Sequence, residues 1–130
     1  MRVLERLDRL YAIGGGPGAN RIGGTPGEDE AHELVAGWMR EARLEVEVDS
    51  AGNLFGRLRG RRPELPEVWT GSHLDSVPNG GRFDGALGVV AALHVLLAQQ
   101  GVWGLRTHDV RAAHDALRAL ARWNETEPTS

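Results

Sequence analysis

Apolar residues recur along the chain at two spacings, and each spacing predicts one kind of element. Helical spacing predicts amphipathic helices over residues 3–12 and 26–43, and a third helix from residue 86 to about residue 98. Strict alternation over residues 44–48 predicts a half-buried strand, and the segment 54–60 reads as its partner. The polar residues between these two segments are typical of a turn.

A further apolar run at residues 68–70 has the length and the β-branched content of a buried strand, and a glycine ends it. The expected order of elements is then α, α, β, β, β, α, which predicts a partial α/β sandwich. Helical spacing returns after Thr107, which predicts one last helix. That helix falls in the tail at residues 99–130.

Both ends of the second helix carry sequence signals. Thr25 is a capping residue type, Pro26 suits the first helical position, and Glu28 stands where it completes a capping box. The helix is expected to stop near Arg43. Glycine is the residue that tolerates a left-handed cap at such a point, so Arg43 costs stability if its φ is positive.

The composition narrows the class of protein. The chain has 130 residues, of which 41% are hydrophobic, no cysteine and a net charge of −3. This suits one modest domain without disulfides or thiol chemistry. The chain starts without the apolar core of a secretory signal, and no apolar run approaches the roughly 20 residues that span a bilayer. We expect a cytoplasmic protein with no membrane or nucleic-acid partner.

Two segments invite a binding interpretation that the sequence does not favour. The glycine-rich stretch at residues 14–24 has no strand before it and no Gly-Lys-Ser/Thr after it, so it predicts a flexible loop rather than a phosphate cradle. The arginines at residues 57–62 form a basic patch without an interleaved aromatic ladder. A solvated strand edge is the preferred interpretation over nucleic-acid binding.

The candidate chemistry lies where the run at 68–70 leads, through a loop, into the helix from residue 86. His73, Asp75 and Asp84 occupy this crossover, and open α/β sheets bind ligands at such points. Imidazole and carboxylate are the usual ligands of zinc-like and manganese-like ions. In an extended segment His73 and Asp75 share one face, where the carboxylate can fix the imidazole tautomer. The ordinary alternative is a hydrogen-bonded pair beside a turn.

The stretch G-S-H-L-D-S-V-P-N-G-G-R-F-D-G-A-L-G-V, residues 71–89, closely resembles the first metal motif of the M20 metallopeptidase family. Its nearest likeness is to the branch of N-carbamoyl-L-amino-acid hydrolases and allantoate amidohydrolases. The resemblance implies that His73 is a terminal ligand of one metal and that Asp84 bridges two metals. It gives Asp75 the catalytic role of orienting His73. Arg21 and residues 41–44 and 49–54 also resemble the amino-terminal region of the family.

The resemblance implies a function for residues 1–98 as the amino-terminal part of a zinc-peptidase-like catalytic domain. The family reaction is the metal-dependent cleavage of C–N bonds in N-carbamoyl amino acids or allantoate-like ureides. Its cofactors are two divalent ions of Zn²⁺, Mn²⁺, Co²⁺ or Ni²⁺, and its substrates are small amides or ureides. An aminopeptidase or deacylase of the same family is the alternative reaction.

One departure from the family pattern bears on activity. The family carries a Glu-Glu pair, in which the first Glu is the general base and the second is a metal ligand. Residues 115–120, the corresponding neighbourhood here, contain no such pair. We therefore expect this chain to be incomplete and inactive by itself, and a non-catalytic binding or assembly module is the alternative. An uncovered sheet edge would also favour a homo-oligomer.

A serine hydrolase built on Ser72 and His73 is excluded by geometry. Adjacent residues of an extended segment point to opposite faces, so the two side chains would not meet. The sequence around Ser72 also lacks the Gly-x-Ser-x-Gly elbow of such enzymes.

Overall fold

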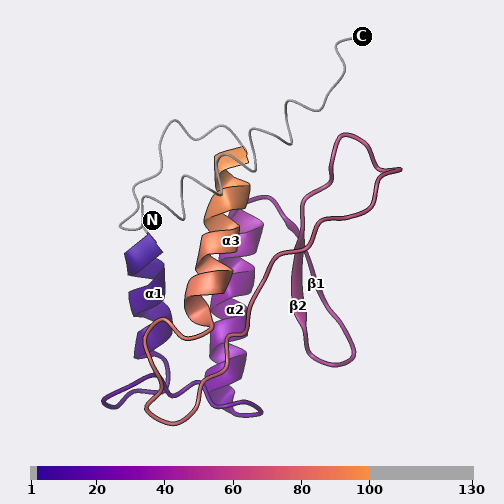
Figure 1. Ribbon diagram of the computed structural model, residues 1–130. Coiled ribbons are helices and arrows are strands. Elements are labelled where there is room, and N and C mark those ends of the chain that lie inside the picture. The colour runs from indigo at the N-terminus through magenta and orange to yellow at the C-terminus, as the bar shows by residue number, and fades with distance from the viewer. Residues whose placement is uncertain (1–2, 100–130) are drawn as a thin grey trace.

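The computed structural model describes residues 3–99, and in that range it confirms an α/β fold (Figure 1). The elements follow one another as α1, α2, β1, β2 and α3. Their bounds are Val3–Ala12, Pro26–Glu41, Glu45–Val48, Leu54–Arg57 and Ala86–Gln99. The tail at 100–130 and its expected helix lie outside the described residues. No helix in the described range is long and apolar enough to cross a membrane.

The core lies between the apolar faces of the three helices, which run side by side in Figure 1. Helix α1 packs against α3, and α2 packs against both strands. The helical periodicity identified most of the helical part of this core, which includes Leu7, Leu10, Ala31, Val35, Trp38, Ala86, Val90 and Leu93. Ile13, Ala19, Leu44 and Leu74 are also buried but lie outside the helices.

The two strands form an antiparallel hairpin in which Glu45 pairs with Arg57 and Val48 pairs with Leu54. Asp49 closes the turn between them, because its Oδ1 accepts hydrogen bonds from the amides of Ala51 and Asn53, both at 2.9 Å. An Asp side chain that binds the backbone just ahead of it is a common way to build a turn. The predicted hairpin is therefore present, with both strands shorter than expected.

The third strand predicted at residues 68–70 is not present in the described structure. Trp69 does pack edge-on against Phe55 of β2, with ring centroids 5.5 Å apart, and Glu67 pairs with Arg57 at 3.1 Å. These are side-chain contacts, whereas a strand requires backbone hydrogen bonds to a neighbour. In the described chain the sheet contains β1 and β2 alone, so the segment lacks such a neighbour. Val68 is 68% exposed, although its sequence is that of a buried strand.

The start of α2 differs in detail from the expected capping box. Pro26 is the first helical residue, as predicted. The hydroxyl of Thr25, however, donates to the carbonyl of Ile22 at 2.6 Å and caps no helical amide. Glu28 accepts from the amide of Gly24 at 2.7 Å, one residue before the expected partner. The carboxylate still lies beside the helix N-terminus, where negative charge is favourable.

The end of α2 has a left-handed cap at Arg43, the residue near which the helix was expected to stop. Arg43 has a φ of 58°, its amide donates to the carbonyl of Arg40 at 2.9 Å, and the amide of Leu44 donates to Met39 at 3.0 Å. This pair of bonds is the Schellman motif, in which glycine is the usual left-handed residue. Arginine at this position carries backbone strain, because its Cβ crowds the neighbouring carbonyl.

We predict that Arg43→Gly stabilises the chain by about 0.5–1 kcal/mol. Relief of the left-handed strain exceeds the extra entropy that glycine gives the unfolded chain. The side chain of Arg43 is exposed, so little packing is lost. Urea denaturation followed by circular dichroism measures the change.

Arg40→Gly is the matched control, because Arg40 is also exposed but lies within α2. There the same substitution should lower stability by up to about 1 kcal/mol. Equal destabilisation by both substitutions would contradict the assigned cap.

Candidate metal site

The segment that carries His73 and Asp75 is extended, and its side chains alternate between the core and the surface. Leu74 and Ser76 are buried, at 6% and 5% exposure. The side chains of His73 and Asp75 are 51% and 46% exposed. This alternation is the period-2 pattern of an extended chain. It puts His73 and Asp75 on one accessible face, as expected, while the residues between and after them anchor the segment.

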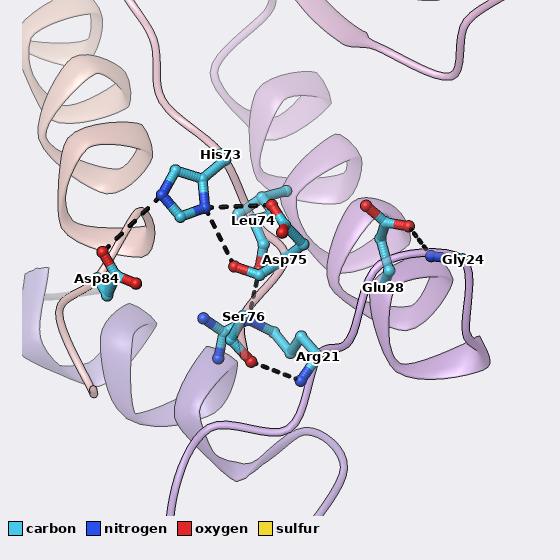
Figure 2. Close-up of polar contacts among 8 residues, drawn as sticks. All are labelled: Arg21, Gly24, Glu28, His73, Leu74, Asp75, Ser76 and Asp84. Atoms are coloured by element: carbon cyan, nitrogen blue, oxygen red, sulfur yellow. Dashed lines mark hydrogen bonds and ion pairs between the residues drawn. The ribbon is translucent and has the colours of Figure 1, made fainter. Parts of the chain in front are cut away.

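The imidazole of His73 is oriented by Asp75 (Figure 2). Its Nδ1 lies 3.1 Å from the Oδ1 of Asp75 and 3.1 Å from the backbone oxygen of the same residue. A carbonyl and an ionised carboxylate only accept hydrogen bonds, so Nδ1 must carry the proton in both contacts. In the neutral ring the free lone pair is then on Nε2, the atom that remains available to a ligand.

Asp84 faces that free nitrogen, with its Oδ1 3.9 Å from the Nε2 of His73 (Figure 2). Zinc binds nitrogen and oxygen at about 2.1 Å, so two such ligands at a tetrahedral angle lie about 3.4 Å apart. The side chain of Asp84 is 60% exposed and has room to rotate by the small remaining distance. The pair therefore fits two ligands of one divalent ion.

The pair does not form a complete metal site by itself. Within residues 3–99, no group of three or more His, Cys, Asp or Glu side chains is arranged to hold an ion. Asp75 is occupied with Nδ1 of His73, on the side of the ring away from Nε2. A tight structural or catalytic site needs at least three protein ligands.

Gly85 makes room for the imidazole at the start of α3. Its φ is +65°, and a Cβ added there would lie 2.6 Å from the Cε1 and Nδ1 atoms of His73. No real side chain tolerates such a contact, so the residue after Asp84 must lack a Cβ for the ring to occupy this position. The glycine thus brings α3, and Asp84 with it, close to the imidazole.

The glycine-rich stretch clamps the loop that carries Asp84. The amide of Ala19 donates to the carbonyl of Gly80 at 3.0 Å, and the amide of Gly80 donates back to Ala19 at 2.9 Å. Beside this bridge the amide of Asn79 donates to the side-chain oxygen of Asn20 at 2.8 Å. Interpretation of this stretch as a flexible loop missed the clamp, because its partners lie far away in the sequence.

Hydrogen bonds to Arg21 hold the extended segment at residues 73–76 in place. The amide of Ser76 donates to the carbonyl of Arg21 at 2.8 Å, and the amide of Arg21 donates to the hydroxyl of Ser76 at 3.0 Å. The guanidinium of Arg21 is fully buried and donates to the carbonyls of Leu74 and Leu10. An ion pair between Arg82 and Asp8 joins the loop to α1.

The electrostatics of the site centre on Arg21. Burial lowers the pKa of this guanidinium, and the negative charges of Asp75 and Asp84 act in the opposite direction. An arginine pKa starts so far above neutrality that the group stays charged. The two exposed carboxylates thus lie in the field of one buried positive charge. Periodicity gave no signal for this residue, but the family resemblance had included it.

Comparison with known proteins identifies relatives of this chain. No family model matches the chain. An N-carbamoyl-L-amino acid amidohydrolase of Geobacillus stearothermophilus is 50% identical over 97 residues, which are 73% of this chain and 24% of that protein. A ureidoglycolate hydrolase of Arabidopsis thaliana is 39% identical over 94 residues, which are 71% of this chain and 20% of that protein.

Solved structures agree with these relatives. A hydantoinase/carbamoylase family amidase from Burkholderia ambifaria superposes with a TM-score of 0.70 at 40% identity, over 73% of this chain and 24% of that one. The chain therefore spans about a quarter of the length of the relatives it matches. In sequence and in fold, it is a homologue of part of the amidohydrolases of the hydantoinase/carbamoylase family, as the resemblance of residues 71–89 implied.

Proposed function

We propose that this chain is part of the catalytic domain of a metal-dependent amidohydrolase that cleaves C–N bonds of N-carbamoyl amino acids or allantoate-like ureides. The observation that carries the proposal is the position of the His73 Nε2, which faces the Oδ1 of Asp84 at 3.9 Å. The relatives named as N-carbamoyl-L-amino acid amidohydrolase and allantoate deiminase support the substrate class.

In this proposal each of the three residues has one role. His73 would be a terminal ligand of one ion through Nε2, and the carboxylate of Asp84 would be a ligand shared by two ions. Asp75 holds the proton on Nδ1 and so would keep the lone pair of Nε2 available to an ion. A bound divalent ion supplies Lewis-acid polarisation of the substrate carbonyl and lowers the pKa of water. Orientation of the imidazole is thus the contribution of this part of the chain.

The same proposal implies that the chain by itself does not catalyse hydrolysis. Hydrolysis also requires a base that takes a proton from water, and further ligands that complete each ion. The described residues provide only His73 and Asp84 toward one ion. The Glu-Glu pair that provides the base in the family has no counterpart at residues 115–120.

Metal affinity tests the site directly. We predict that the chain binds Zn²⁺ or Mn²⁺ with no better than micromolar affinity in isothermal titration calorimetry, because two ligands hold an ion weakly. His73→Ala should remove even this binding. Submicromolar affinity that His73→Ala abolishes would contradict the prediction and show that further residues complete the site.

An activity assay tests whether the chain is catalytically incomplete. We predict no measurable release of ammonia or ureide products from N-carbamoyl amino acids or allantoate with added Mn²⁺, Co²⁺, Ni²⁺ or Zn²⁺. Loss of the general base alone removes about 10²–10⁴ in rate. Asp84→Ala is the control for contaminating activity. Turnover that disappears in Asp84→Ala would show that the chain is catalytically complete.

A peptide or N-acyl amino acid belongs in the same assay, because an aminopeptidase or deacylase was the alternative reaction. Metal-dependent turnover of one of these, sensitive to Asp84→Ala and absent with carbamoyl substrates, would favour the alternative.

We also propose that the chain self-associates through the unpaired segment at 68–70. An exposed extended segment rich in apolar side chains is a site for pairing between chains. Light scattering should detect species larger than a monomer, and Val68→Lys should reduce them. Leu65→Lys is the matched control, since Leu65 is also exposed, at 47%, but precedes the segment. A monomer at every concentration would contradict the proposal.

A further inference from the structure

We infer that Arg21 is a positioning residue for the candidate metal site, which it orders through the carbonyl of Leu74. The residue lies 53 positions before Leu74 in the sequence and touches neither His73 nor Asp84 with a hydrogen bond in the described structure. The inference rests on the proposed metal site and adds the residue that sets its geometry.

Both the backbone and the side chain of Arg21 form hydrogen bonds that hold the extended segment at residues 73–76, and the side chain also binds the end of α1. Its Nε donates to the carbonyl of Leu74 at 2.7 Å, and its Nη1 donates to the carbonyl of Leu10, at the end of α1, at 2.8 Å. Its own amide and carbonyl bind Ser76. The bonds to Leu74 and Ser76 fall on either side of Asp75, so the backbone of that residue is held from both directions.

The carbonyl of Leu74 belongs to the peptide that joins Leu74 to Asp75. A fixed plane for this peptide limits the ψ of Leu74 and the φ of Asp75, which are the soft torsions of the backbone here. The two acceptors of the His73 Nδ1–H group are the carboxylate and the backbone oxygen of Asp75. The backbone oxygen of Asp75 belongs to the next peptide, so a change in the φ of Asp75 would displace both acceptors together relative to His73 and release the imidazole.

Stability alone is a poor explanation for a charge in this position. A buried charge loses its hydration, and apolar residues of similar volume often serve stability as well or better. The Nη2 of Arg21 is buried without a hydrogen-bond partner in the described structure, which adds to that cost. What arginine offers instead is a planar fork whose donors reach two carbonyls in a fixed geometry.

Arg6 is a matched control within the same chain. It is also an arginine that is nearly fully buried, at 4% exposure, and burial also lowers its pKa. Its described contact is with the ring of Trp38, 5.2 Å from the centroid, and its electrostatic neighbour is Glu41. Removal of Arg6 should therefore destabilise the core without acting on the extended segment.

The tautomer of His73 is the measurement that separates positioning from stability. Long-range ¹H–¹⁵N NMR correlations of the metal-free full chain report whether Nδ1 or Nε2 carries the proton. The spectra are recorded near pH 8.5, about two units above the usual histidine pKa, so that the rings are neutral. His73→Gln identifies the signals of His73 among the five histidines.

We expect the wild-type chain and Arg6→Met to show His73 with the proton on Nδ1. Arg21→Met should lose this preference, although both Met variants lower the midpoint of urea denaturation. Arg21→Lys keeps the charge but not the planar guanidinium that reaches two carbonyls. This variant should therefore also lose the preference for the proton on Nδ1 of His73. This second variant decides the question if Arg21→Met does not fold.

Retention of the Nδ1–H tautomer in a folded Arg21 variant would overturn the inference and leave Arg21 a structural residue. Loss of the preference in Arg6→Met would overturn it too, because the tautomer would then follow general stability. The experiment uses no metal and no substrate. Its outcome is therefore independent of metal binding and of hydrolysis, and a failure of the proposed function can be told apart from a failure of this inference.

Discussion

The arrangement of the described chain depends on the pairing of two segments that are 55 residues apart, one at residues 19–21 and the other at 76–80. Backbone bonds join Ala19 to Gly80 and Arg21 to Ser76. Without them the loop between Ser76 and Asp84 would be held along its length mainly by side-chain contacts, those of Asn20 with Asn79 and of Arg82 with Asp8. With them, the loop follows a path that returns Asp84 to the imidazole of His73.

Two close approaches then set the fine geometry. Gly85 lets the backbone before α3 pass directly against the ring of His73, and Asp75 holds the ring from the other side. The functional atoms are exposed, whereas the residues that fix them, Leu74 and Ser76, are buried. Precision comes from the core-facing half of the segment, and accessibility from the surface-facing half.

The sequence predicted the parts of this structure that depend on local periodicity. The helices and the hairpin follow from side chains within a few positions of one another. It did not predict the clamp, because bonds such as that from Ala19 to Gly80 join backbone groups and leave no pattern of side chains. The strand expected at 68–70 failed for a related reason, since strand formation is a property of a pair of segments.

In residues 73–76 the side chains that hold the segment are buried and the functional side chains are exposed. This arrangement determines which of the four positions can be substituted. The two outward side chains, at His73 and Asp75, can be replaced without opening the core, because they contribute little to its packing. The inward positions do not have this freedom. The backbone of the crossover can therefore keep its shape while the functional groups at residues 73 and 75 are changed. New donor atoms introduced at those two positions would point in directions that the surrounding structure already sets.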